Sequence, residues 1–347
     1  MKNLFSSILF VLAIAVSHLG QAQTIRRVNN TGVNPQGVNI YSTLQAAHDA
    51  ASGGDIIYLE PSGISYGSLA CTKLLTIIGN GYFLAQNSGL QLDLRESIVD
   101  NIFFNPGSAG SRITGCTIQS SYFGILANNI VVERNQISQA IYIGYHPQTG
   151  ATATVNNALI RQNYITNSLN IYPSGAQTVS SVSISNNIIT GGISSSGAYT
   201  QMNSILIANN VVGNVAGNNG AGIQVDNAVI KNNILTYTST GNFTPRNNAY
   251  SYNISGSTAF GTANGNQQNA TPASLFVGGT ASTDGAYQLR TGSPAIGTGE
   301  SGTDVGAFGG TLPYRVAGIP NVPSIYQYNQ AVSGNSLNAT ISTRSNN

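Results

Sequence analysis

The chain has 347 residues, of which 7% are charged, 41% are hydrophobic and 40 are glycine, and its formal net charge is +2. Soluble domains carry roughly 25% charged residues, so this deficit excludes a coiled coil, a basic nucleic-acid-binding domain and a charge-rich disordered tail. The hydrophobic fraction is sufficient for a large core, but beyond the first two dozen residues no apolar run approaches the ~20 residues of a membrane-spanning helix.

The first 22 residues have the order of a secretory signal peptide. Lys2 precedes the apolar stretch Leu9–Val16, and the small residues Gly20 and Ala22 follow it. A charged, then an apolar, then a small-residue region is typical of segments that are removed after export. We therefore expect cleavage after Ala22 and an exported protein that is secreted, periplasmic or on the cell surface.

A short amphipathic helix is predicted over Ser42–Ala51, just before the first strand at Ile56–Leu59. Ser42 or Thr43 is the expected N-cap, and the glycine pair that begins at Gly53 is expected to end the helix. We interpret this helix as a cap on the N-terminal end of the domain that follows.

The residues after this helix repeat one short pattern, in which an aliphatic residue precedes an asparagine by three positions and an apolar residue follows it by two. The asparagines of this pattern are Asn80, Asn101, Asn135, Asn163, Asn187, Asn210, Asn233 and, in a degraded last copy, Asn248. Cys116 stands in the asparagine position of one further copy. The copies are spaced by roughly the length of one coil of a parallel β-solenoid, and their short β-branched stretches alternate between apolar and polar residues. We therefore predict an all-β protein, a parallel β-helix of nine coils, in which the asparagine side chains form a hydrogen-bonded ladder.

A polar cluster around the fourth and fifth coils is the strongest candidate for chemistry. Glu133 and Arg161 occupy the same outward position on successive coils, Arg134 adjoins Glu133, and the interval between the coils holds an extra loop over 144–157 that contains His146. In a catalytic interpretation an arginine would neutralise an acidic sugar and His146 would move a proton. The alternative is a surface Glu–Arg pair of little energetic value beside an exposed histidine.

Four tyrosines lie in or near the same loop and could offer flat faces to a sugar ring. They are Tyr142, Tyr145, Tyr164 and Tyr172. Long loops on a solenoid often build its binding face. We therefore predict glycan contacts for these four side chains.

The remaining acidic residues are scattered, with no pair in one column on neighbouring coils. Calcium takes six to eight oxygen ligands, and a glycoside hydrolase needs a pair of carboxylates at a set separation. We therefore expect no metal site and no cofactor. Cys71 and Cys116 could pair in an oxidising compartment, or Cys116 could be a small buried residue within the ladder, and the sequence leaves both open.

The chain changes character after residue 310, where three prolines punctuate a linker. Residues Leu337–Thr343 alternate as a short exposed strand. This tail either folds back as a cap on the C-terminal coil or docks to another protein by edge addition. The predicted organisation is thus a signal peptide, a β-helix domain over 23–310 and a tail over 311–347.

Six segments of the chain are informative about its family: Tyr41–Ala47, Gly54–Leu59 and Leu74–Gly81 at the opening, and Tyr287–Arg290, Gly292–Ile296 and Asp304–Phe308 at the close. Through these segments, residues 24–310 resemble secreted right-handed parallel β-helix proteins of the pectate-lyase-like superfamily, of the Bacteroidota type. The resemblance implies a right-handed coil. It implies no single activity, because this fold hosts lyases, hydrolases, epimerases, adhesins and binders without catalysis.

Two functions are compatible with these observations. We expect a non-catalytic, secreted or cell-surface module that contacts glycans, adheres or docks a partner. The alternative is a polysaccharide lyase or glycoside hydrolase with a minimal site near Glu133 and Arg161. The expected partners are an extracellular polysaccharide and a surface protein reached through the C-terminal strand, and nucleic acid is not among them.

Overall fold

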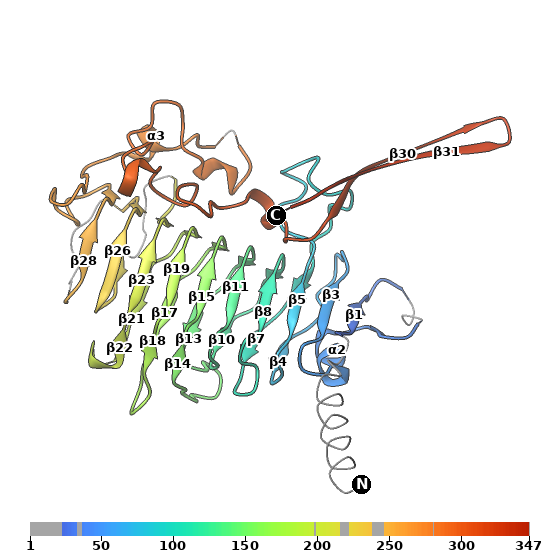
Figure 1. Cartoon of the computed structure of the whole chain (residues 1–347), viewed down its shortest axis with the longest axis horizontal. Helices are drawn as coiled ribbons and strands as arrows, with labels where there is room; N and C mark the ends of the chain where they lie inside the picture. Colours follow the sequence, from blue (N-terminus) through green and yellow to red (C-terminus); the bar gives the residue numbers. More distant parts are fainter. Residues whose placement is uncertain are drawn as a thin grey trace, which may run out of the picture.

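A computed structural model describes residues 23–32, 37–197, 199–215, 222–237, 246–279 and 281–346. The predicted signal peptide lies outside the described residues. Figure 1 shows a rod of stacked β-coils with a hairpin that projects from it. Within the described ranges, no helix has both the length and the apolar character needed to cross a membrane.

Three parallel sheets run along the rod. The eleven-stranded sheet contains β1 (Ile25–Val28), β2 (Ile40–Tyr41), β3 (Ile56–Leu59), β5 (Thr76–Ile78), β8 (Arg112–Thr114), β11 (Val131–Glu133), β15 (Leu159–Arg161), β19 (Ser183–Ser185), β23 (Ile205–Ala208), β26 (Ala228–Lys231) and β28 (Ala249–Ser251). The eight-stranded sheet contains β6 (Ile98–Val99), β9 (Thr117–Ile118), β12 (Gln136–Ile137), β16 (Tyr164–Ile165), β20 (Ile188–Ile189), β24 (Val211–Val212), β27 (Ile234–Leu235) and β29 (Ile254–Ser255). The seven-stranded sheet contains β4 (Leu69–Cys71), β7 (Ile102–Phe104), β10 (Phe123–Ile125), β13 (Ile141–Ile143), β17 (Leu169–Ile171), β21 (Ile193–Ser195) and β25 (Ile223–Gln224).

Each coil visits the three sheets in turn. The chain leaves β11, enters β12 in the eight-stranded sheet, passes β13 in the seven-stranded sheet and returns to β15 beside β11. A small three-stranded sheet of β14 (Val155–Asn156), β18 (Val179–Ser180) and β22 (Met202–Asn203) extends three of the returns. The predicted right-handed parallel β-helix is thereby confirmed.

Aliphatic side chains at equivalent positions of successive coils fill the interior. In the eleven-stranded sheet the inward column is Ile77, Ile113, Val132, Ile160, Ile184, Ile207 and Ile230, each with no exposed surface. Full burial of such a side chain stabilises the fold by roughly 1.5–3 kcal/mol. Because strand side chains alternate, the neighbouring positions point outward and are free to carry polar residues.

A ladder of asparagine amides runs along the turn between the eleven-stranded and eight-stranded sheets. Its members are Asn135, Asn163, Asn187, Asn210, Asn233, Asn253 and Asn266. The Oδ1 of each member from Asn163 onward accepts hydrogen bonds from the backbone N–H and the Nδ2 of the member before it. Cys116 begins the ladder, since its backbone N–H donates to Asn135 Oδ1 at 3.0 Å.

The structure thus brings five of the eight predicted asparagines together and places three elsewhere. Asn80 donates to the carbonyls of Asp93 and Arg95, and Asn101 donates to Ser68. Asn80 and Asn101 belong to one coil, because residues 79–97 leave the rod between β5 and β6, so the nine predicted copies are not nine coils.

Asn248 also lies outside the ladder. It precedes β28, where its Nδ2 donates to Val225 O. The last two ladder positions are taken instead by Asn253 and Asn266.

The residue just before each ladder asparagine has left-handed backbone geometry. Its φ is 54° at Asn186, 55° at Asn209 and 56° at Asn232. Asparagine tolerates this conformation better than most residues. The two residues of each repeated Asn–Asn pair therefore have different roles: the first adopts the left-handed conformation of the turn, and the second joins the ladder.

Helix α2 (Leu44–Ala50) covers the N-terminal end of the rod (Figure 1). Thr43 is its N-cap, and its Oγ1 accepts from Ala46 N at 3.2 Å. Leu44 and Ala47 are buried in the main core. The predicted capping helix is present, although it begins two residues later than Ser42.

The C-terminal part of the chain packs over the outer face of the eight-stranded sheet. The outward column there is apolar from Tyr164 through Ile188, Val211, Ile234 and Ile254. Helix α3 (Pro272–Leu275) and the 3₁₀ turns η2 (Gly285–Tyr287), η3 (Glu300–Gly302) and η4 (Val316–Gly318) form part of the cover. The buried side chains of the cover are Leu275, Phe276, Ala286, Tyr287, Ala295, Val305, Ala307 and Tyr314. Such a cover is needed because paired aliphatic residues leave this sheet apolar on both faces.

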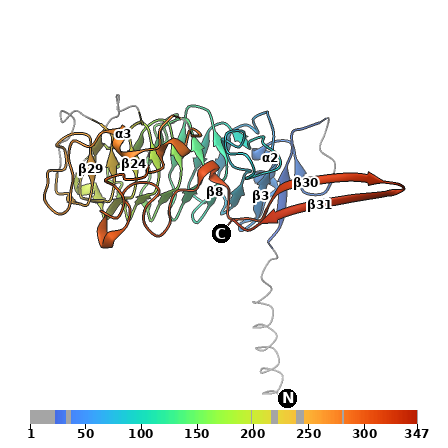
Figure 2. The same ribbon diagram turned by 90° about the horizontal axis from the view of Figure 1, so that it is seen from above.

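The tail returns along the rod to the first coils. It ends in an antiparallel hairpin of β30 (Ser324–Ser333) and β31 (Ser336–Arg344), which projects from the rod (Figure 2). Near the base of the hairpin, Leu92 N donates to Ile325 O at 2.8 Å. The tail therefore lies against the first coils and does not cap the C-terminal coil, and it forms two strands where one was predicted.

Both cysteines are free and have no exposed surface. Cys71 lies on β4 and Cys116 lies at the start of the ladder, so the disulfide that the sequence left open is not formed. Burial raises the pKa of both thiols, which lowers the fraction of reactive thiolate. We expect iodoacetamide to label neither cysteine in the folded protein and both in urea, as measured by mass spectrometry. Rapid labelling without denaturant would contradict this placement.

Candidate functional site

The extra loop after β13 folds onto the outer face of the seven-stranded sheet. Tyr145 and Thr152 form an antiparallel bridge, and His146 N donates to Ala151 O at 2.8 Å. Gly144 begins the loop with φ 88°, and a Cβ there would lie 3.0 Å from Tyr172 O. Glycine is therefore required at this turn.

Three of the four predicted tyrosines gather beside this loop. The rings of Tyr145 and Tyr172 stack with centroids 4.5 Å apart and an angle of 27°. The ring of Tyr142 lies 5.9 Å from that of Tyr145. All three residues are half-buried, so each keeps part of its surface exposed to solvent.

Polar side chains continue the outward column that contains Tyr142. Asn170 and Ser194 follow it on the next two coils, and Ser194 Oγ donates to Asn170 Oδ1 at 2.7 Å. An aromatic cluster beside amide and hydroxyl groups can stack on the apolar face of a sugar and hydrogen-bond its hydroxyls.

Tyr164 lies apart from this cluster. It points outward from the eight-stranded sheet, is 6% exposed and packs against Phe83 and Tyr287 under the C-terminal cover. Burial raises the pKa of Tyr164. In this position its ring presents no free face to a ligand.

His146 packs flat against Phe103 on the outer face of the seven-stranded sheet. Their ring centroids are 3.9 Å apart at an angle of 11°. Gly124 lies next to Phe103 in the same column, and a Cβ there would lie 2.9 Å from the Phe103 ring. Burial lowers the pKa of His146, which favours a neutral imidazole at pH 7.

Glu133 lies on the eleven-stranded sheet and is only 1% exposed at its side chain. Its Oε1 pairs with Arg112 and its Oε2 accepts from Arg161 Nε at 2.7 Å. Both carboxylate oxygens are therefore engaged by guanidinium groups. The structure brings Glu133 and Arg161 together as predicted from their register, and it places His146 on a different sheet.

Arg134 lies in the turn after β11 and is 5% exposed. Its Nε donates to Gln162 Oε1 at 3.0 Å and its Nη1 to Ile319 O at 2.9 Å. It thus faces the C-terminal tail, and both of these acceptors are uncharged.

Sequence reasoning missed the residues that complete these clusters. Arg112 stands one position before the aliphatic marker Ile113 and reaches Glu133 diagonally across neighbouring strands, so a search along one column overlooks it. Arg315 and Arg344, which line a hollow together with Arg134, come from the tail, and no repeat pattern links them to Arg134.

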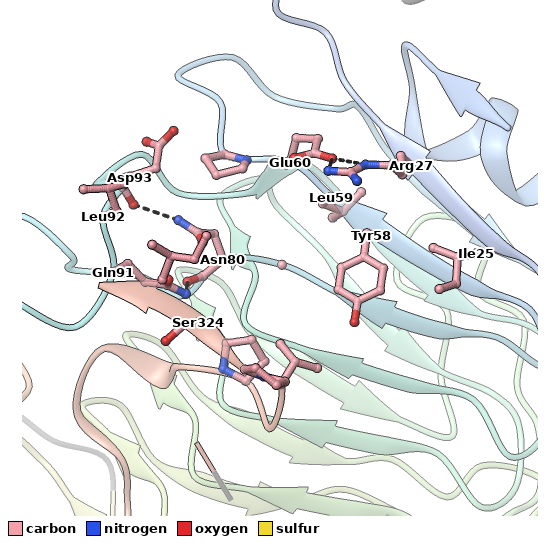
Figure 3. Close-up of a pocket in the computed structure, with 16 residues that line it drawn as sticks. Ile25, Arg27, Tyr58, Leu59, Glu60, Asn80, Gln91, Leu92, Asp93 and Ser324 are labelled. Carbon is pink, nitrogen blue, oxygen red and sulfur yellow. Dashed lines mark hydrogen bonds and ion pairs between the residues drawn. The ribbon is translucent and has the colours of Figure 1, made fainter. Parts of the chain in front are cut away.

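A hollow of about 480 Å³ lies between the first coils and the tail (Figure 3). Tyr58 and Ile25 lie on one side and Ser324 on the other, and Arg27 pairs with Glu60 at its edge. The docked tail creates this hollow.

Within the described ranges, no three side chains among His, Cys, Asp and Glu come together in a way that could hold a metal ion.

No protein-family model matches the sequence, and no curated protein matches it. Among solved structures, the chain is similar to a crystal structure of pectate lyase Pel9A. The identity is 14%, the TM-score is 0.36, and the alignment covers 83% of this chain and 97% of that chain. This similarity carries no information on activity.

Proposed function

We propose that this chain is an exported, non-catalytic β-helix module that binds a glycan through Tyr142, Tyr145 and Tyr172. The observation that carries the proposal is the partly exposed stack of Tyr145 on Tyr172, 4.5 Å apart, beside the polar column of Asn170 and Ser194. Tyrosine supplies a large contact area and loses little conformational entropy on binding.

The engagement of Glu133 by two arginines favours binding over catalysis. A general acid or base must reach the proton that it transfers, and both oxygens of this buried carboxylate already accept from Arg112 and Arg161. The sequence features of a signal peptide support export to the cell surface or the medium.

The test is retention of purified residues 23–347 on a panel of immobilised acidic and neutral polysaccharides. Against the polysaccharide retained best, we expect Tyr145→Ala to weaken binding by about tenfold, the loss typical of a central aromatic contact. Tyr328→Ala is the matched control, since Tyr328 is 41% exposed on the hairpin, and we expect it to bind like the parent.

Two outcomes would overturn the proposal. One is equal retention of the parent and Tyr145→Ala proteins. The other is the appearance of new reducing ends or unsaturated uronates that Arg161→Ala abolishes, which would establish the lyase or hydrolase alternative.

A further inference from the structure

A second hollow, of about 250 Å³, lies where the tail crosses the turn between β11 and β12. Arg134 lines it from the turn, and Arg315 and Arg344 line it from the tail, with Leu90 and Ile319 as apolar wall. The whole chain has 13 lysines and arginines. Three of them therefore converge on one small hollow in a protein with few charges.

The guanidinium of Arg134 is buried without an opposing charge of its own. It donates to Gln162, to Ile319 O and to Asn346 O, which are all neutral acceptors. Among the described residues, no carboxylate lies within ion-pair distance of it. Burial lowers the pKa of Arg134, Glu133 opposes that shift, and Arg315 adds to it. A buried cation of this kind is stabilised by an anion that shares its site.

Glu133 cannot supply that anion, since both of its oxygens are held by Arg112 and Arg161. The charged groups that act on Arg134 are Glu133 and three further arginines, Arg112, Arg161 and Arg315. Glu133 is therefore not available to neutralise Arg134.

Arg344 adds an unused donor. Its Nη2 donates to Leu90 O at 2.6 Å, while its Nε is buried and has no hydrogen-bond partner. Buried donors of this kind usually have a partner, and an oxyanion in the hollow would be a suitable one.

We infer that this hollow is an oxyanion-binding site, built jointly by the β-helix and its tail, for a sulfate, phosphate or carboxylate group. Arginine suits this ligand, because its planar fork of donors matches the oxygens of such groups. The site lies at the turn between the eleven-stranded and eight-stranded sheets, so it is separate from the tyrosine cluster on the seven-stranded sheet. The inference goes beyond the proposed glycan binding and does not depend on it.

The test is calorimetric titration of residues 23–347 with sodium sulfate, phosphate and glucuronate, at constant ionic strength made up with sodium chloride. We expect saturable binding that is about tenfold weaker or worse in Arg344→Gln, which removes charge-assisted hydrogen bonds. Arg134→Lys keeps the positive charge but loses the planar set of guanidinium donors, and we expect a similar loss of affinity for the oxyanion. Arg290→Gln is the matched control, since Arg290 lines a different hollow and its loss lowers the net charge equally.

Equal binding by the parent and Arg344→Gln proteins, or no saturable binding by the parent, would overturn the inference. Arg344→Gln keeps the test decisive if Arg134→Lys fails to fold.

Glucose 6-sulfate, compared with free sulfate and with glucose, identifies the source of the anion. Tighter binding of the sugar sulfate indicates an acidic glycan, and tighter binding of free sulfate indicates an inorganic ion, and both support the site.

The outcomes separate this inference from the proposed function. Glycan retention that depends on Tyr145, together with no oxyanion binding, would overturn the inference alone. Oxyanion binding that depends on Arg344, together with no glycan retention, would overturn the proposed function alone.

Discussion

Replacing Asn187 by alanine is expected to lower the free energy of unfolding by about 3–5 kcal/mol. Asn187 has no exposed surface. Its Nδ2 donates to Ile160 O at 2.9 Å and to Asn210 Oδ1 at 3.0 Å, and its Oδ1 accepts from the N and Nδ2 of Asn163 at 2.9 and 3.0 Å. Alanine would leave the buried Asn163 N–H without its acceptor, and each buried group left unpaired costs about 1–3 kcal/mol.

The measurement is urea unfolding followed by circular dichroism. Asn167→Ala is the control, because Asn167 is exposed and a surface change of this kind is worth less than about 0.5 kcal/mol. If Asn187→Ala unfolded at the same urea concentration as Asn167→Ala, the ladder would not contribute to stability as argued.

The repeat made the fold predictable because each coil is built by the same local rule. Ile184 and Asn187 keep their spacing in coil after coil, with an inward aliphatic residue and a turn that follows it. The pattern fails to identify a ladder asparagine where the aliphatic residue three positions before it is absent. Asn253 and Asn266 complete the ladder with a tyrosine and an alanine three positions earlier, so the aliphatic marker did not find them.

The sequence contained a signal that the outer face of the eight-stranded sheet is covered. Ile188 and Ile189 are consecutive and both fully buried, although a strand with one solvated face would place a polar residue at one of the two. Ile234 and Leu235 repeat this feature. Such pairs predict that something covers the sheet, but they do not say which segment does so.

The arginine clusters around Glu133 and Arg134 were less predictable than the fold, because some of their side chains come from segments that are distant in sequence. Register placed Glu133 beside Arg161, since both lie within the repeat. Arg344 meets Arg134 only after the tail has returned along the rod. Periodicity carries no information on that return, and neither does the sequence of the tail alone.

Asp284→Ala is expected to release the C-terminal cover from the first coils. We expect the free energy that holds the cover on the rod to fall by about 3–5 kcal/mol. Asp284 has no exposed surface. Its Oδ2 accepts from Ala317 N at 2.6 Å and from the Tyr314 hydroxyl at 3.2 Å, and its Oδ1 accepts from Asn87 Nδ2 at 3.2 Å. The carboxylate thus joins the segment that leaves the rod at 79–97 to two points of the tail.

The hydroxyl groups around this carboxylate strengthen the expectation. Tyr314 uses its proton for Asp284, so the Tyr82 hydroxyl donates to Tyr314 at 2.6 Å. Burial raises the pKa of both tyrosines, which keeps both hydroxyls protonated as donors. Removing the carboxylate therefore leaves the Ala317 N–H and one of the two tyrosine hydroxyls buried without an acceptor.

Limited digestion with trypsin measures this release, because cleavage after Arg315 requires the tail to open locally. A loss of about 3 kcal/mol corresponds to a rate of cleavage roughly a hundredfold higher. Asp93→Ala is the control, since the Asp93 side chain is 37% exposed and pairs only with the exposed Arg95, and we expect it to be cut like the parent. Asp284→Asn should lie between the two, because the amide keeps one acceptor but turns a donor toward groups that already donate. A cleavage rate for Asp284→Ala equal to that of the parent would mean that apolar packing alone holds the cover on the rod.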